Sequence, residues 1–190
     1  MKTVLSALAL TAALAGQSLA GQFVVELDAP LDLAEGAVAG STVTLDETLS
    51  AGVDSYAIFS AEDQGELEGF LDATGIEAMK ISEVLFVNSP TVGGGEPVAE
   101  EVADNHAVYV IERPIPGVGF FGLEKKQAIS RNSNAAIEML GDVIAWDHSY
   151  LTSEGTYCVY RADSPETLRE HGALAGAPIG RITEVVQQRH

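Results

Sequence analysis

The chain is short of basic residues and of cysteine, and both shortages narrow what it can be. Its 190 residues include 10 Lys and Arg against 28 Asp and Glu, a formal net charge of -18 at pH 7. Nucleic acids and anionic membranes repel so acidic a surface, and we expect neither as a partner. The single cysteine, Cys158, excludes an intramolecular disulfide. The fold must therefore be stabilised by its core, for which the 46% of hydrophobic residues suffice.

Several short motifs of nucleotide-binding and hydrolytic proteins are also missing. The sequence contains no G-x-x-x-x-G-K-[ST], no H-E-x-x-H, no C-x-x-C and no G-x-S-x-G. The run Gly93-Gly94-Gly95 lies in a connecting segment and does not make a phosphate loop. We therefore expect no nucleotide cofactor.

The first twenty residues have the pattern of a signal peptide. Lys2 supplies a positive charge, residues 4–15 are mostly apolar, and Ser18-Leu19-Ala20 is a small-x-small cleavage site. The apolar run is shorter than the roughly 20 residues that span a membrane. We expect cleavage after Ala20 and export of a soluble protein to the periplasm or the exterior, with no membrane insertion afterwards.

The rest of the chain contains an internal repeat. Residues 56–84 align with residues 157–185 at a constant offset of 101, with seven identical and four conservative pairs. A short segment ending at Glu26 also resembles the segment ending at Glu112. We expect two homologous units at 21–87 and 106–190. The linker at 88–105 is rich in glycine, proline and acids, and should be flexible or extended.

The second unit has the element order β-α-β-β-α-β of a ferredoxin-like fold. We expect strands at 107–113, 142–152, 156–162 and 182–187, a helix at 123–140, and a second helix capped by Ser164. The apolar face of the first helix is expected at Ala128, Ile129, Ala135, Ala136, Met139 and Leu140. In the first unit, Asp63 and Glu66 predict a capping box for the second helix. Residues 31–40 are too few for a long helix, so the first unit should lack most of its first helix.

In each unit the third strand is apolar on both faces. Tyr56 and Ile58 alternate with Ala57 and Phe59, and residues 157–160 repeat this pattern. A sheet with water on one face alternates apolar and polar residues, so the second face must also be covered. We therefore expect an α+β fold in which the two ferredoxin-like units pack sheet to sheet as an intramolecular pseudo-dimeric barrel, and a monomer in solution.

A set of motifs in the second unit points to a family. In chain order they are Val110-Ile-Glu-Arg-Pro with Pro116-Gly117, Trp146-Asp-His-Ser-Tyr-Leu151, Tyr157-Cys-Val-Tyr-Arg-Ala162, Leu168-Arg-Glu-His171, Pro178 and Ile182-Thr-Glu-Val185. With them, residues 106–190 resemble a small bacterial family of domains of unknown function whose members include nickel-binding proteins. The resemblance implies a ferredoxin-like fold that pairs as a dimer, with a role in binding nickel or another divalent transition metal. The first unit lacks most of these motifs.

Two histidines are candidate metal ligands, because imidazole is a common ligand of transition metals. His148 lies on the second strand of its unit, and Glu47 stands at the equivalent place in the first unit. His171 lies on the inner face of the second helix, where Phe70 is its counterpart. Each also has a structural interpretation: His148 as a strand residue packed on Trp146, and His171 as a core residue hydrogen-bonded to a strand.

Cys158 and Glu112 complete the candidate metal ligands. Cys158, whose counterpart is Ala57, is either a thiolate ligand or a small buried hydrophobe. Glu112 recurs as Glu26, so it belongs either to the architecture of the repeat or to a site near the mouth of the barrel.

Three functions agree with these observations. The first is an exported binding protein for a divalent transition metal, nickel by resemblance, or for a small ligand. The second is an α+β-barrel enzyme with His148 or His171 as general base, although no catalytic residue is identified. The third is a scaffold that binds a protein partner. We expect any metal site in the second unit alone, and metal affinity should fall as His148 is protonated near its reference pKa of about 6.5.

Overall fold

The computed structural model describes residues 20–33, 37, 40–98 and 105–190. The expected signal peptide lies almost wholly outside these residues. Within the described part the chain is an α+β protein with three α-helices and an antiparallel nine-stranded sheet. No described helix is both long enough and apolar enough to cross a membrane.

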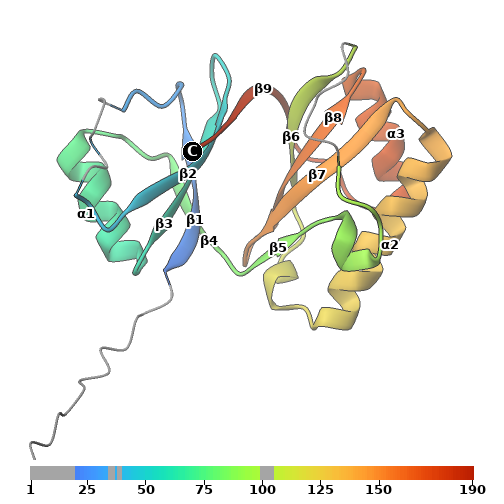
Figure 1. Ribbon diagram of the computed structural model, residues 1–190, viewed down its shortest axis with the longest axis horizontal. Helices are drawn as coiled ribbons and strands as arrows, with labels where there is room; N and C mark the ends of the chain where they lie inside the picture. Colours follow the sequence, from blue (N-terminus) through green and yellow to red (C-terminus); the bar gives the residue numbers. More distant parts are fainter. Residues whose placement is uncertain (1–19, 34–36, 38–39, 99–104) are drawn as a thin grey trace, which may run out of the picture.

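The strands follow the order β4-β1-β3-β2-β9-β6-β8-β7-β5. Figure 1 shows two sheet-containing halves side by side, with α1 outside the first and α2 and α3 outside the second. The strands are β1 (Gly21–Leu27), β2 (Thr44–Ser50), β3 (Ser55–Ala61), β4 (Lys80–Val84), β5 (Phe86–Asn88), β6 (Ala107–Arg113), β7 (Ile144–Leu151), β8 (Thr156–Ala162) and β9 (Ile182–Arg189). The α-helices are α1 (Gln64–Thr74), α2 (Leu123–Leu140) and α3 (Pro165–Ala175), and the 3-10 helices are η1 (Pro90–Gly93) and η2 (Val118–Phe120).

The expected elements of the second half are confirmed. The bounds of β6, α2 and β8 agree with the sequence-based expectation, and Ser164 caps α3 by accepting a hydrogen bond from the amide of Thr167. In the first half Asp63 caps α1 through the amide of Glu66. The described residues between β1 and β2 form no helix. Residues 34–36 and 38–39 of that expected loop lie outside the described part.

Two stretches of chain each pair with strands of both halves. Residues 80–84 pair with β1, and β5, which follows after one residue, pairs with β7. In β9, residues 182–185 pair with β6, and residues 186–189 pair with β2. The sheets of the two halves are therefore joined by backbone hydrogen bonds as well as by side chains.

The strands β3 and β8, the third strands of the two halves, are buried on both faces and lie between one inner core and two outer cores. Tyr56 and Ile58 of β3 belong to the same buried cluster as Tyr157 and Val159 of β8. The opposite face of β3 packs with Leu67 and Leu71 of α1, and the opposite face of β8 packs with Leu168 of α3. The expectation that both faces are covered is thus confirmed.

The beginning of the expected linker is neither flexible nor extended. Asn88 is buried and accepts a hydrogen bond of 2.7 Å from Ser130 Oγ, and Asn134 Nδ2 donates to the carbonyl of Pro90 at 3.0 Å. A Cβ added to Gly93 would lie 2.7 Å from the backbone nitrogen of Arg131. The segment from Asn88 to Gly95 therefore packs tightly against α2.

This packing also corrects the expected apolar face of α2. Met139, expected in the core, is 72% exposed, and Ala135 is exposed. The buried residues of α2 are Lys126, Ser130, Ser133 and Ala136. The helix is rotated from the expected orientation because part of its polar side is covered by η1 and the adjoining chain, which supply hydrogen-bond partners for Ser130.

Substitutions of Tyr56 and Tyr157 test the inner core. Their side chains are 1% and 4% exposed, and their rings meet edge to face at 5.8 Å. We expect Tyr56→Ala and Tyr157→Ala each to lower the free energy of unfolding by roughly 3–5 kcal/mol, the usual cost of removing a large core aromatic. Urea denaturation measures this loss. The matched Tyr→Phe variants, which keep the ring, should lose less; a loss below about 1 kcal/mol in both alanine variants would contradict this core.

Candidate functional site

The four candidate metal ligands lie in three different places. His171 and Cys158 line one cavity, His148 belongs to a second cluster, and Glu112 to a third. Among the residues that the structure describes, no group of three or more His, Cys, Asp or Glu side chains is arranged to hold a metal ion. Each place is described in turn.

Glu112 belongs to a cluster that links the two halves, here called the tyrosine–glutamate cluster. Tyr56 Oη donates to Glu112 Oε1 at 2.6 Å, and Tyr157 Oη donates to Glu26 Oε1. Each tyrosine therefore donates to the glutamate of the other half. The cluster consists of Glu26, Tyr56, Lys80, Glu112, Tyr157 and Arg181.

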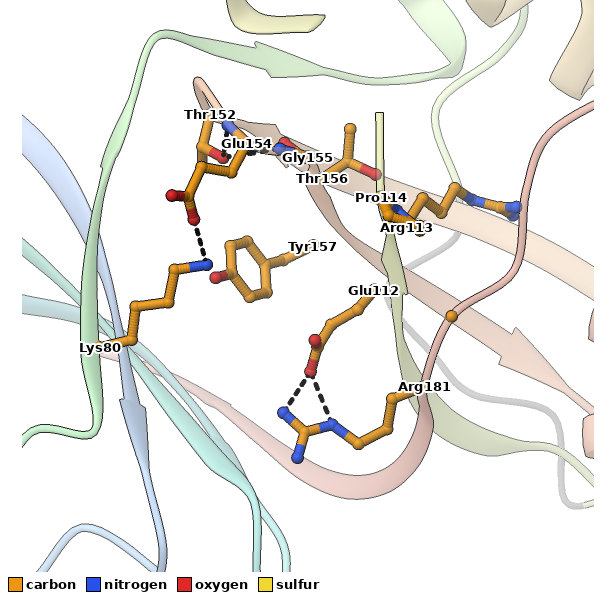
Figure 2. A pocket seen from close by; sticks show the side chains of 11 residues that line it. Lys80, Glu112, Arg113, Pro114, Thr152, Glu154, Gly155, Thr156, Tyr157 and Arg181 are labelled. Atoms are coloured by element: carbon orange, nitrogen blue, oxygen red, sulfur yellow. Dashed lines mark hydrogen bonds and ion pairs between the residues drawn. The ribbon is translucent and has the colours of Figure 1, made fainter. Parts of the chain in front are cut away.

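The carboxylates of this cluster are already paired. Figure 2 shows Glu112 bound to Arg181 and Lys80 bound to Glu154, with the ring of Tyr157 between them. Arg181 also contacts Glu26 at 3.3 Å. Burial and the hydrogen bond to Glu26 raise the pKa of Tyr157 to about 12, so both hydroxyls stay protonated and act as donors. These contacts agree with a role of Glu112 in the architecture of the repeat, the first of its two interpretations from the sequence.

His148 lies in the second cluster, here called the histidine cluster. Its Nε2 is 3.1 Å from Glu47 Oε2, and its Nδ1 is 3.4 Å from Asp147 Oδ1. Tyr150 Oη donates to Glu47 Oε2 at 2.8 Å. The same carboxylates also bind Gln187 and Arg189. The internal repeat places Glu47 and His148 at equivalent positions of the two units, and the fold brings these two side chains into contact.

The histidine cluster holds a charged imidazole. Burial alone would lower the pKa of His148, but its hydrogen bonds to Asp147 and Glu47 outweigh burial and raise the pKa to about 9. Burial likewise opposes ionisation of Glu47, yet the contacts with His148 hold its pKa below the usual value. The expectation that His148 titrates near 6.5 is therefore wrong, because two buried carboxylates stabilise the imidazolium.

The third place, here called the helix-side cavity, lies in the second half between the sheet and the helices α2 and α3. Its volume is about 430 Å³. Its walls include the apolar side chains of Pro114, Pro116, Phe121, Ile129, Trp146 and Pro178. Its polar lining includes Arg113, Ser133, Cys158, Tyr160 and His171. Two sequence candidates, His171 and Cys158, thus meet in one cavity.

A chain of hydrogen bonds orients His171. Ser133 Oγ lies 3.0 Å from Tyr160 Oη and 3.1 Å from His171 Nε2. Burial and the charge of Arg113 lower the pKa of His171 to about 4, so its ring is neutral at pH 7. Burial raises the pKa of Tyr160 to about 12, so its hydroxyl stays protonated. In one arrangement Tyr160 Oη donates to Ser133 Oγ, which then donates to His171 Nε2. In this arrangement the proton of the neutral ring is on Nδ1.

Two buried nitrogen atoms of the cavity residues lack a partner among the described residues. They are Nδ1 of His171, whose side chain is 1% exposed, and Nη2 of Arg113, whose side chain is 5% exposed. Arg113 donates through Nη1 to the carbonyl of Pro178 at 2.9 Å, and its guanidinium lies 5.9 Å from the ring centroid of Tyr160. Unpaired buried donors are costly in a folded protein and mark a place where a ligand or water binds.

Arg113, Ser133 and Tyr160 were not among the sequence candidates. Arg113 follows Glu112 on β6, and Figure 2 shows the two side chains directed apart. That alternation of strand side chains could have placed Arg113 on the helix side of the sheet. No sequence signal distinguishes Ser133 from the other serines of α2.

Glycines with the spacing G-x-G-x-x-G also precede α2, at Gly117, Gly119 and Gly122. This spacing is a signature of nucleotide-binding proteins, so its presence between β6 and α2 counts against the expectation of no nucleotide cofactor. In dinucleotide-binding folds this motif opens the helix of a parallel βαβ unit, whereas β6 is antiparallel to both of its neighbours. Here Gly117 adopts a φ of 77°, and a Cβ on Gly119 would lie 2.7 Å from the carbonyl oxygen of Thr152. The turn and its close packing account for these two glycines.

Comparison with known families agrees with the resemblance noted from the motifs. Residues 109–185 match the family described as "Nickel responsive protein SCO4226-like". The match lies entirely within the second half. No curated protein matches the chain.

One solved structure resembles most of the chain rather than the second half alone. A mutant chlorite dismutase from Candidatus Nitrospira defluvii has a TM-score of 0.50 at 12% identity, covering 89% of this chain and 92% of the other. The chlorite dismutase of the same organism in complex with imidazole has a TM-score of 0.46 at 12% identity, covering 92% of each chain. The first likeness shows that the chain shares its overall fold with the chlorite dismutase.

The raised pKa of His148 predicts how stability depends on pH. The folded chain binds this proton more tightly than the unfolded chain, so the contribution is complete below about pH 6.5 and is lost as the pH rises through about 9. Wild-type protein should lose roughly 1–3 kcal/mol between pH 6.5 and 9.5, since each unit of pKa shift corresponds to about 1.4 kcal/mol.

Urea denaturation at several pH values measures this loss. In His148→Gln the decline should be clearly shallower, because the titrating group is absent. Parallel profiles for the two proteins would show that His148 does not carry this stabilisation.

Proposed function

We propose that the chain is an exported binding protein that holds a small, largely apolar molecule in its helix-side cavity. Export rests on the signal-peptide pattern of residues 1–20, with cleavage after Ala20 and a periplasmic or extracellular destination. The observation that carries the binding role is the cavity itself. A concave, mainly apolar site with a few convergent polar groups is the usual form of a small-molecule site.

The proposal includes an intramolecular pseudo-dimeric barrel made of two ferredoxin-like units, with a monomeric mature protein. The pairing of β9 with β2 and of β5 with β7 across the two halves supports this proposal. The reciprocal Tyr56–Glu112 and Tyr157–Glu26 hydrogen bonds also support it. In this reading each unit takes the place that a second subunit would hold, and the inner sheet faces need no other chain.

The two halves differ on their helix sides, which supports placing the ligand in the second. In the first half Phe70 replaces His171 and packs against Phe59, with ring centroids 5.9 Å apart. Leu67 and Leu71 are buried beside them. Apolar side chains thus occupy the space that corresponds to the cavity.

A binding role has more support than catalysis by a histidine base. His148 is held protonated by its two carboxylates and cannot accept a proton near pH 7. His171 is neutral but its pKa of about 4 makes it a weak base.

A paired substitution on α3 tests the cavity. Ala175 is partly buried and lines the cavity, whereas Ala173 on the same helix is exposed. We expect the uncharged fluorescent probe N-phenyl-1-naphthylamine to bind wild type and Ala173→Phe alike, and Ala175→Phe at least tenfold more weakly because the added ring occupies the cavity. Fluorescence titration measures the affinities. Equal binding to all three proteins, or none to wild type, would contradict the proposed site.

The second candidate function is nickel binding, favoured by the family matched at residues 109–185. The histidine cluster is the place most suited to a cation, because it combines an imidazole with the carboxylates of Glu47 and Asp147. Nickel would have to displace the proton of His148, so its affinity should rise with pH up to about 9.

Calorimetric titration with nickel tests this candidate at about 0.15 M salt, where weak binding to the acidic surface is screened. We expect about one ion per chain at pH 8.5, weaker binding at pH 7, loss of binding in His148→Ala and retention in the control His171→Ala. Absence of uptake by wild type, or unchanged binding in both variants, would reject the histidine cluster as the metal site.

A further inference from the structure

We infer that the ligand of the helix-side cavity is an apolar monocarboxylic acid whose carboxylate binds Arg113 and His171. This inference rests on the proposed function, since it names the class of molecule that the cavity holds. It is carried by the charge of the lining, by the unpaired buried donors and by the shape of the apolar walls.

The cavity is cationic in a strongly acidic protein. The chain has 28 acidic side chains, yet none of the Asp and Glu residues that the structure describes lines this cavity, whereas Arg113 and Lys125 do. Lys125 is exposed, and its Nζ lies 3.3 Å from the ring centroid of Phe121. Arg113 is buried, and no carboxylate of the described residues forms an ion pair with it. A buried guanidinium without an anionic partner is costly, and an acidic ligand would supply that partner.

The unpaired groups include one fixed donor and one that depends on the histidine tautomer. Arg113 Nη2 can only donate, and Nδ1 of His171 donates in the arrangement in which Ser133 Oγ donates to Nε2. Both residues flank the ring of Tyr160: the His171 ring centroid lies 5.0 Å from that of Tyr160, and Arg113 Cζ lies 5.9 Å from it. A carboxylate beside Tyr160 has one oxygen atom for each of these donors, and its bond to Arg113 would be charge-assisted.

The remaining lining selects an apolar body. Trp146, Phe121 and the three prolines at 114, 116 and 178 surround a space of about 430 Å³. This volume lies within the usual range of about 300–1,000 Å³ for small-molecule sites. A ring system or a short hydrocarbon chain attached to one carboxylate fits this combination of size and polarity.

Two probes of nearly equal shape measure how much the carboxylate contributes to affinity. They are 1-naphthoate and 1-naphthalenemethanol, titrated calorimetrically at pH 7.5 against wild type, Arg113→Met and the control Arg131→Met, which changes an exposed arginine of α2 outside the cavity lining. We expect wild type and Arg131→Met to bind the acid at least tenfold more tightly than the alcohol. Arg113→Met should bind both probes alike, because it keeps an apolar wall and loses the charged donor. His171→Phe, which copies the first half at Phe70, should weaken the preference for the acid and serves if Arg113→Met does not fold.

The outcomes separate this inference from the function on which it rests. If neither probe nor N-phenyl-1-naphthylamine binds wild type, the cavity is not a ligand site and both proposals fail. If the neutral probes bind and the acid has no advantage, the cavity binds ligands but the acid class is wrong. An acid preference that persists in Arg113→Met or in His171→Phe would overturn the role given to that residue.

Discussion

The fold depends on the apolar contact between the inner faces of its two sheets. Tyr56 and Ile58 of β3 meet Tyr157 and Val159 of β8 there, and all four side chains are buried. The hydrophobic effect favours this contact without directing it, so the direction comes from the polar groups around it. Each tyrosine hydroxyl reaches a glutamate of the other half, and β5 and β9 add backbone pairing across the junction.

The inner faces of the sheets are occupied by this contact, and the helix-side cavity lies on the opposite face of the second sheet. In the first half one helix lies directly on the sheet and Phe70 fills the gap. In the second half two helices cover the sheet, and α2 packs along η1 through its serine-bearing side. A cavity then remains between α2, α3 and the sheet. The repeat therefore produced two halves with one architecture and different interiors.

Electrostatics distinguishes this cavity from the other two clusters. In the tyrosine–glutamate cluster the carboxylates are matched by Lys80 and Arg181, and in the histidine cluster they are matched by His148 and Arg189. The helix-side cavity differs because its buried cation, Arg113, forms no ion pair with a carboxylate of the described residues. The acidic surface and the basic cavity can coexist because the helices separate them.

The sequence by itself determined the strands and helices of the second half and the need to cover both faces of the third strands. Strand and helix bounds follow from local patterns, such as the Ser164-Pro165 cap and the two-faced third strands, and the offset of 101 identified equivalent residues such as Tyr56 and Tyr157. Local patterns decide such features because a helix cap and the alternation of strand side chains depend on residues only a few positions apart. The motif resemblance to a nickel-related family was likewise present in the sequence alone.

The tertiary structure alone decided which chemical groups meet. His148, His171, Cys158 and Glu112 looked equivalent as candidate ligands, yet the fold distributes them among three places. The pKa of His148 rises and that of His171 falls because one imidazole lies between carboxylates and the other lies in an apolar cavity beside Arg113. The buried polar side of α2 was likewise unpredictable, since it depends on η1, a segment whose composition resembles a linker. Contacts between residues far apart in the chain set burial, charge and hydrogen bonding, and no local pattern records them.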